Sequence, residues 1–247
     1  MNWVEELFYT LRLRGEGCFD EAIAVYRRRL AENPHDLTIR SHLASTLFVK
    51  GDIAAAITER KRVLEAKPDD HIGRANLVKM LLAHGELDKA LTEAKDLVRR
   101  RPEAHVSHTS LGNVYRHLGD IPATIRCYEH AAILPKAYVN IFVSLGGLYE
   151  ESGRMEDAVN AYRTALAKAP RYLMALIGLG RALSVMGRLA EAHEQWQKAI
   201  DIATPNLNPT KPSRSFDRIV PGFDKEHLSL EKIVEMAREY LEKSRSR

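Results

Sequence analysis

The chain of 247 residues lacks most of what marks a disulfide-rich, metal-binding or membrane-spanning protein. It has only two cysteines, Cys18 and Cys127, and their placement fits neither a disulfide framework nor a metal motif, so reduced thiols are predicted. No stretch reaches the ~20 apolar residues of a membrane span, and the first residues contain acids and arginines where a signal peptide needs an apolar run. We therefore expect a soluble, cytoplasmic protein without a membrane segment.

The motifs of the common enzyme classes are also missing. We find no Gly-rich phosphate loop before a helix, no GxSxG elbow, no HExxH and no CxxC pair. His105, His108 and His117 lie in one expected helix, but no carboxylate or thiol stands at a fixed spacing from them. The sequence predicts no enzyme, no cofactor and no metal site.

The excess of positive over negative charge is also small. The 37 Lys and Arg residues exceed the 33 Asp and Glu residues by four, which gives a net charge of +4. So small an excess does not by itself indicate nucleic acid as a partner.

What the sequence does contain is a 34-residue period. Glycine recurs at this interval six times, at Gly17, Gly51, Gly85, Gly119, Gly153 and Gly187. If the unit begins at Trp3, the chain divides into six repeats with no linkers: 3–36, 37–70, 71–104, 105–138, 139–172 and 173–206. A period of this length predicts an array of like units that bury their apolar faces on their neighbours.

Each repeat has the pattern of two helices joined by a turn. In repeat five, Leu145 and Tyr149 mark one helix face, Gly153 interrupts the pattern, and Ala158 and Tyr162 mark the face of a second helix. Position 8 carries Thr10, Ala44, Val78, Gly112, Gly146 and Gly180, and position 20 carries Ala22, Ala56, Ala90, Thr124, Ala158 and Ala192. Position 24 is aromatic at Tyr26, Tyr128, Tyr162 and Trp196, and position 32 carries Pro34, Pro68, Pro102 and Pro170. Small residues allow close helix approach, and proline ends the second helix.

These residues resemble the tetratricopeptide repeat over 3–206, although the Trp expected at position 4 is absent everywhere. The resemblance implies an all-α fold: a right-handed α-solenoid of six helix-turn-helix units, with the first helices lining a concave groove. It also implies a protein that works by binding other proteins.

The remainder of the chain departs from the period. Residues 207–228 read as an extended linker, and residues 229–243 as a C-terminal helix with Ser229 as its cap. We expect this helix to cover the end of repeat six; docking on a partner or on a second copy is the alternative. Two apolar surfaces are also predicted, one in repeat one at Val4, Leu7, Phe8 and Leu11, and one in repeat six at Met174, Ile177 and Val185. We expect the tail around Phe216–Phe223, or the same segment of a second molecule, to cover one of them.

The predicted binding surface consists of positions 2, 5, 6, 9, 12 and 13 of the first helices, which lie opposite the stacking face at 100° per residue. We call this surface the variable face, because its residues differ from repeat to repeat. Its polar, mostly basic centre suits an extended peptide, since Asn bonds a peptide backbone and Lys or Arg holds a carboxylate. The candidate partner-binding residues are His42, Asn76, Lys79, Asn113, Arg116, Asn140, Ser144 and Arg181.

Three functions follow in order of preference. The first is a non-catalytic adaptor or assembly scaffold that holds a protein or peptide, acidic where it meets Lys79 and Arg116, in the groove. The second is a self-associating structural scaffold, a homo-oligomer, built through apolar ends and the basic runs 27–29 and 99–101. RNA binding is a distant third, disfavoured by the weak net charge. Chaperone-binding members of the family place Lys at position 5, which no repeat has here, so a chaperone-tail adaptor is disfavoured.

Overall fold

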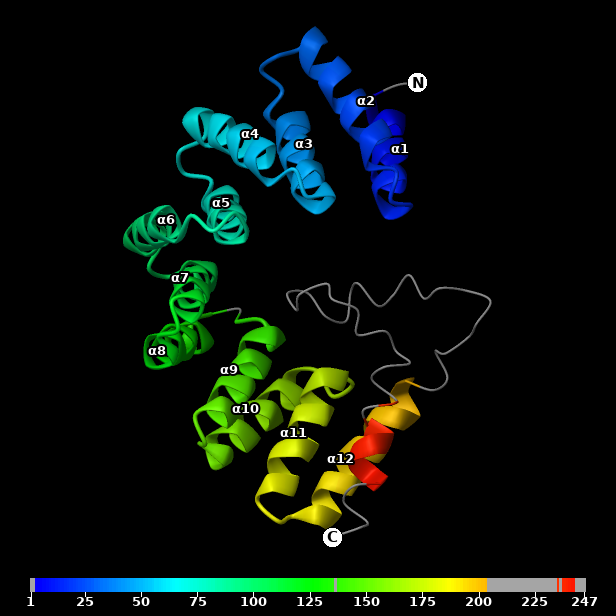
Figure 1. The fold of residues 1–247 in the computed structure, drawn as a ribbon, viewed down its shortest axis with the longest axis vertical. Helices are drawn as coiled ribbons and strands as arrows, with labels where there is room; N and C mark the ends of the chain where they lie inside the picture. Colours follow the sequence, from blue (N-terminus) through cyan, green and yellow to red (C-terminus); the bar gives the residue numbers. More distant parts are fainter. Residues whose placement is uncertain (1–2, 136, 204–234, 236, 243–247) are drawn as a thin grey trace. The chain divides into compact units, whose positions relative to one another are not determined.

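The computed structural model describes residues 3–135, 137–203, 235 and 237–242, with side chains from residue 8 onward. Within these ranges the chain is helical and contains no strand (Figure 1). The helices are α1 (Trp3–Gly15), α2 (Phe19–Glu32), α3 (Leu37–Lys50), α4 (Ile53–Ala66), α5 (His71–Ala83), α6 (Leu87–Arg100), α7 (His105–His117), α8 (Ile121–Ile133), α9 (Val139–Glu151), α10 (Met155–Lys168), α11 (Leu173–Val185) and α12 (Leu189–Ala203). Each repeat therefore provides two helices, and the all-α prediction is confirmed.

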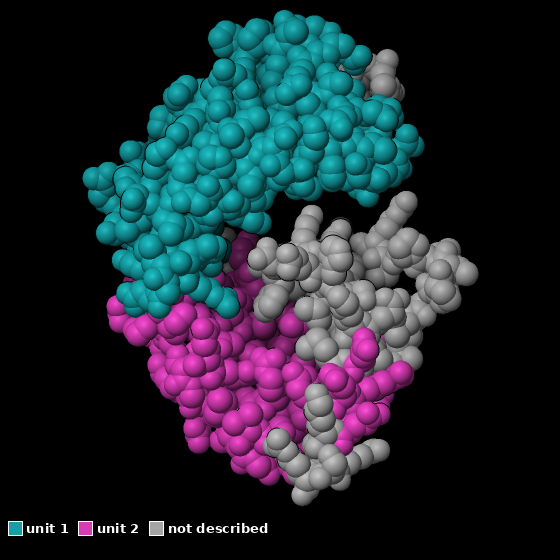
Figure 2. Space-filling view, in the orientation of Figure 1, with its two compact units in different colours: residues 1–120 teal, residues 121–247 magenta. Residues whose placement is uncertain are grey.

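The helices belong to two compact units, residues 1–120 and residues 121–247 (Figure 2). Unit 1 contains α1 to α7, and unit 2 contains α8 to α12. Within each unit every helix packs on the next one along the chain. The division falls between the two helices of repeat four, so the structural units do not end where a repeat ends.

The six periodic glycines take the backbone through the turn of each hairpin. All six have positive φ, between 73° and 103°, a region that residues with a Cβ enter only at a cost. After α3, for example, Gly51 N–H donates to the carbonyls of Leu47 and Phe48, and Asp52 N–H donates to Leu47 O at 2.9 Å. This left-handed cap satisfies carbonyls at the helix end and reverses the chain.

Small residues at positions 8 and 20 hold the helices of a hairpin close together. Every position-20 residue, from Ala22 to Ala192, is fully buried, and every position-8 residue is buried. The predicted packing role of both positions is confirmed.

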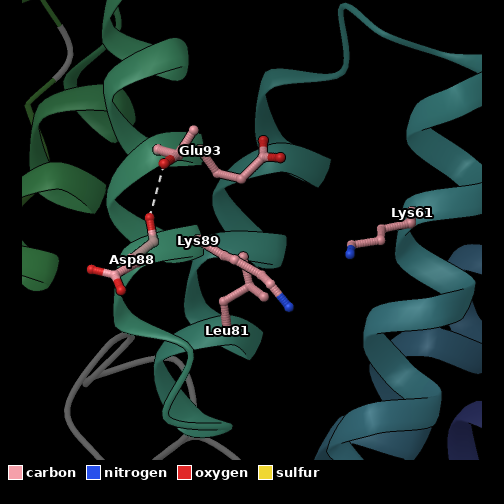
Figure 3. A pocket seen from close by; sticks show the side chains of 6 residues that line it. Lys61, Leu81, Asp88, Lys89 and Glu93 are labelled. Atoms are coloured by element: carbon pink, nitrogen blue, oxygen red, sulfur yellow. Dashed lines mark hydrogen bonds between the residues drawn. The ribbon is translucent and has the colours of Figure 1, made fainter.

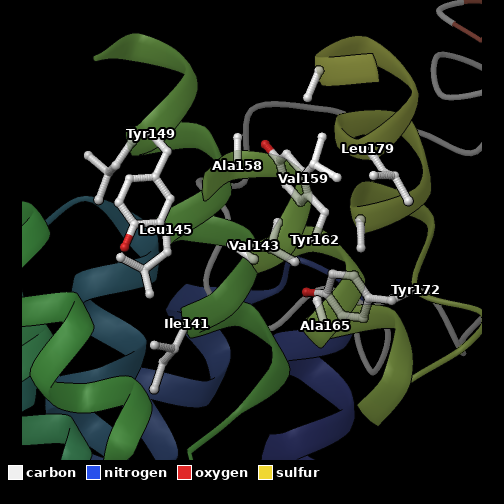
Figure 4. Packing of buried hydrophobic residues seen from close by; sticks show 14 of the residues in the cluster. Ile141, Val143, Leu145, Tyr149, Ala158, Val159, Tyr162, Ala165, Tyr172 and Leu179 are labelled. Carbon is white, nitrogen blue, oxygen red and sulfur yellow. The ribbon is translucent and has the colours of Figure 1, made fainter. Parts of the chain in front are cut away.

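The Tyr162 ring shows how tight this packing is (Figure 4). A Cβ added at Gly146 on α9 would lie 2.5 Å from Cε1 of Tyr162, and one added at Gly178 on α11 would lie 2.4 Å from its Cζ. The ring therefore lies between two helices that approach closely only because both residues lack a side chain. In the sixth repeat, Gly180 stands in the same relation to Trp196, at 2.2 Å from Nε1.

The described part of the C-terminal helix packs on repeat six. Ala237 is fully buried, and the Tyr240 ring stacks on Trp196 of α12 with centroids 5.2 Å apart and an interplanar angle of 18°. Leu241 packs against the same core. These contacts confirm a capping helix; its predicted start at Ser229, the linker 207–228 and the covering role of Phe216–Phe223 lie outside the described residues.

The predicted apolar ends are only partly exposed. Phe8 and Leu11 of repeat one are 68% and 41% exposed, and Val185 of repeat six is 64% exposed. Ile177 is buried and Met174 is partly buried, because both pack in a cluster with Leu173 and Ala203. The prediction of exposed apolar surface in repeat six was therefore wrong for Ile177. The side chains of Val4 and Leu7 lie outside the described residues.

Candidate functional site

The structure divides the candidate residues between the two units. Unit 1 brings together five of them on three consecutive first helices: His42 on α3, Asn76 and Lys79 on α5, and Asn113 and Arg116 on α7. Unit 2 holds the other three, Asn140 and Ser144 on α9 and Arg181 on α11.

The variable face of unit 1 offers accessible cationic groups. Lys79, Asn113 and Arg116 are exposed or nearly so, and Asn76 is half-buried. The Nζ atom of Lys79 lies 5.5 Å from the centroid of the Phe48 ring, a cation–π contact with position 12 of the preceding repeat. Neither Lys79 nor Arg116 forms an ion pair with any described residue.

Several cations of unit 1 that lie off this face are paired. Arg40 meets Glu59 at 2.5 Å, and Arg74 meets Glu93 at 2.5 Å, in both cases from a first helix to the second helix of the same repeat. Lys50 meets Asp20 at 2.6 Å. None of the variable-face positions in repeats one to four carries Asp or Glu, so no ion pair can form within this face.

The same face also exposes apolar side chains. Besides Phe8 and Leu11, Val49 at position 13 of repeat two and Ile72 at position 2 of repeat three are about half exposed, at 42% and 51%. The variable face of unit 1 thus carries both unpaired cations and exposed apolar side chains.

His42 is half-buried and held in place by an aromatic neighbour. Its ring stacks on Tyr26, with centroids 6.1 Å apart and an interplanar angle of 17°. Burial, and then the positive charges of Arg14 and Arg60, lower the pKa of His42 below its ordinary value, although Asp36 opposes the shift.

Arg60, on α4, is a site residue that the sequence reasoning missed. It occupies position 24 of repeat two, where four of the six repeats have an aromatic residue, and it is only 4% exposed. Its Nη2 atom donates to Ser45 Oγ at 3.3 Å and to Ser41 O at 3.5 Å, which brings the guanidinium to the variable face of α3. The signal that could have found it is the replacement of an aromatic residue by a cation at a core position.

Position 24 reaches the variable face in other repeats as well. Tyr26 contacts His42, and Tyr162 interacts with Glu150 and Arg181. Burial, followed by the negative charge of Glu150, raises the pKa of the Tyr162 hydroxyl. Residues of the second helices therefore help to set the chemistry of a face formed by the first helices.

Unit 2 differs from unit 1 because its cation is paired. Arg181 Nε lies 2.6 Å from Glu150 Oε2, and these two residues occupy position 9 of repeat six and position 12 of repeat five. Burial by itself would lower the pKa of Arg181, but the hydrogen bond and charge of Glu150 outweigh it and raise the pKa. Asn140 and Ser144 are half-buried.

A separate pocket in unit 1 is small and is lined mainly by charged residues (Figure 3). It encloses about 240 Å³ between α4, α5 and α6, and its lining residues are Lys61, Leu81, Asp88, Lys89, Thr92 and Glu93. Ligand pockets usually exceed ~300 Å³ and are mostly apolar. Here Lys89 pairs with Glu86, and Glu93 pairs with Arg74.

The histidines do not converge on a metal-binding geometry. His108 is buried and its Nε2 donates to Pro102 O at 2.7 Å, whereas His117 donates from Nδ1 to Asn113 O at 2.9 Å. Searching the described residues finds no group of three or more potential metal ligands. None of the described helices combines the length and the apolar character needed to cross a bilayer.

Sequence profiles of one class of protein match most of the chain. Profiles described as tetratricopeptide repeat match residues 13–73, 76–131 and 144–208. The hairpins, turn glycines and small-residue contacts described above are those of this class. The chain belongs to the tetratricopeptide-repeat family, whose members generally mediate protein–protein interaction or assembly.

Solved structures agree on the fold. A thermophilic tetratricopeptide-repeat protein of Thermus thermophilus is 27% identical and has a TM-score of 0.60, with 72% of this chain and 97% of that chain covered. MamA is 24% identical, with a TM-score of 0.57 and coverage of 66% and 96%. Yeast Tom70 is 14% identical, with a TM-score of 0.71 over 91% of this chain and 44% of its own. No curated protein matches the chain in sequence.

Proposed function

We propose that this protein is a non-catalytic adaptor or assembly scaffold, and that the variable face of unit 1 binds a segment of another protein that carries both acidic and apolar side chains. The observation that supports this most directly is the absence of acids at every variable-face position of repeats one to four. Lys79 and Arg116 thus remain available to an anionic partner, and Asn76 and Asn113 can bond its backbone. The exposed Phe8, Leu11, Val49 and Ile72 supply apolar contact.

Replacing Lys79 and Arg116 together by Ala tests the proposal. The variant should bind acidic, leucine-containing peptides more weakly than the wild type by ~1–3 kcal/mol, because two charge-assisted contacts are lost. Affinities would be measured by fluorescence anisotropy on a peptide panel in which Glu is exchanged for Gln.

The matched control replaces Lys67 and Lys95 by Ala. Both lysines are exposed and lie on or beside second helices, so the control removes the same charge from unit 1 but not from the variable face. Equal losses in the two double variants would indicate a general charge effect and would refute specific binding by this face. So would equal affinity for the Glu and Gln peptides.

Self-association is the second candidate, and the exposure of Phe8 and Val185 in the first and last repeats favours it. Sedimentation velocity over a hundredfold range of concentration separates the two functions. A homo-oligomer whose mass falls on dilution, and falls further in a Phe8→Ser/Val185→Ser variant, would support the scaffold.

A further inference from the structure

Arg60 is a buried cation at a position where four of the other five repeats have an aromatic ring. Tyr26, Tyr162 and Trp196 at the same position are 1–2% exposed, and Arg60 is 4% exposed. Burying an arginine has a high desolvation cost unless an anion or several hydrogen bonds compensate it. The groups around its guanidinium therefore determine whether this desolvation cost is compensated within the protein.

The hydrogen bonds of Arg60 within the protein are few and long. Only Nη2 forms any with the described residues, at 3.3 Å to Ser45 Oγ and 3.5 Å to Ser41 O. The Nε atom is buried without a hydrogen-bond partner, and no carboxylate of the described residues lies within ion-pair distance. The charge of Asp70 opposes the lowering of the Arg60 pKa by burial, but Asp70 Oδ1 already accepts a hydrogen bond from Gly73 N at 2.8 Å at the start of α5.

A second basic group, Arg14, acts on the same histidine as Arg60. Arg14 on α1 and Arg60 on α4 both act electrostatically on His42 of α3, which lies between them in the order of the array. The Nε atom of Arg14 is also buried without a hydrogen-bond partner. Arg14, His42 and Ser45 are only half-buried and occupy positions 12, 6 and 9 of their repeats, so the cluster opens on the variable face.

We infer that Arg60, with Arg14 and the Ser45 hydroxyl, forms a binding site for a carboxylate of the partner segment. This inference rests on the proposed function, because it assigns the carboxylate to the acidic segment that unit 1 binds. A carboxylate placed here would accept hydrogen bonds from guanidinium groups in a poorly hydrated environment, where charge-assisted bonds are strongest.

The site can be tested without knowing the partner. In nitrogen-15 spectra of the full chain, the Nε–Hε signal of Arg60 would be followed while sodium acetate is added, with sodium chloride at equal ionic strength as a control. We expect a saturable shift for Arg60 and none for Arg62, which lies on the same helix, is exposed and is already bound to Glu59 at 2.7 Å. The carboxylate site would be overturned if Arg60 and Arg62 shifted by the same amount, or if chloride caused the same shift as acetate. It would also be overturned if inorganic phosphate caused a saturable shift of Arg60 and acetate did not.

Peptide binding then tests the link to the proposed function. The probe is an acidic Glu- and Leu-containing peptide, made with a free and with an amidated C-terminus. Arg60→Tyr restores the aromatic residue of the other repeats and should weaken binding at least tenfold, while Arg62→Gln should change it less than twofold. Arg60→Met is a second variant if Arg60→Tyr fails to give the wild-type helical circular dichroism.

The outcomes separate the two hypotheses. If Arg60→Tyr binds like the wild type while Lys79→Ala/Arg116→Ala binds weakly, the carboxylate site is wrong and the proposed function stands. If the wild type binds no acidic peptide, the proposed function falls, and the acetate titration alone decides the site. Loss of binding on amidation identifies a terminal carboxylate, and unchanged binding identifies a Glu side chain.

Discussion

Two adjacent glycines on α9 give a sharp test of the packing described for repeat five. A Cβ at Gly146 would lie 2.5 Å from two atoms of the Tyr162 ring, whereas a Cβ at Gly147 would meet only its hydroxyl oxygen, at 3.9 Å. Both substitutions to Ala remove the same backbone freedom and should each gain about 0.5–1 kcal/mol from it. Only Gly146→Ala adds overpacking, which costs ~1–3 kcal/mol, because Gly178 blocks the ring on its other side.

The difference between the two variants is thus the informative quantity, since the backbone contribution cancels. We expect Gly146→Ala to be less stable than Gly147→Ala by ~1–3 kcal/mol, which is roughly 2–4 °C in melting temperature per kcal/mol for a chain of this size. Urea unfolding followed at 222 nm would measure it, with amide hydrogen exchange in α9 and α10 to locate the loss, because repeat arrays need not unfold in one step. Equal stability of the two variants would show that the ring is not confined as described.

Three further predictions follow from the described contacts. Tyr240→Ala should destabilise repeat six, because it removes the stacking on Trp196. We expect the stacking to account for ~0.5–1.5 kcal/mol in addition to the free energy lost with the buried apolar area of the ring. Faster hydrogen exchange in α12 would show this loss, and unchanged exchange would argue against the capping role of the C-terminal helix. Glu150→Gln should destabilise unit 2 by ~1–3 kcal/mol, because Arg181 loses the negative charge of its partner. Adding Arg181→Gln should recover part of this loss. If the effects of the two substitutions on the urea midpoint are strictly additive, the pairing is contradicted. Because the pKa of His42 in the folded protein lies below 6.5, the unfolded chain binds a proton at His42 more readily than the folded protein does. The contribution of His42 to stability is therefore present above pH 6.5 and is lost as the pH falls. His42→Gln should flatten the dependence of the melting temperature on pH between pH 7 and 5, whereas the control His35→Gln, at an exposed histidine, should not; equal slopes for the two variants would exclude the effect.

The hairpins were predictable because their determinants are local and repeated. A glycine with positive φ every 34 residues, and a small residue at position 20, are visible in the sequence and have the same role in each copy. The packing of Ile177 was not visible, because it depends on a cluster that includes Ala203, 26 positions further on, and Tyr240 of the C-terminal helix.

The candidate site was predicted only in part. The helical periodicity placed Lys79 and Arg116 on the same type of face, but it could not show that Arg181 meets Glu150, 31 residues away on another helix. It also gave no reason to notice Arg60, since a pattern built from the aromatic residues at position 24 omits the two repeats that lack one, with Arg60 and Ala94. Exceptions to a repeated pattern therefore carry as much functional information as the pattern itself.

The reach of position 24 has a consequence for redesign. Its side chain begins on the second helix of a hairpin and interacts with residues of the variable face, as Tyr26, Arg60 and Tyr162 show. Selectivity could thus be retuned, one hairpin at a time, by exchanging a single interior residue while every solvent-facing amino acid is kept. Duplicated genes could diverge in ligand preference by the same route, with almost no change in their surface residues.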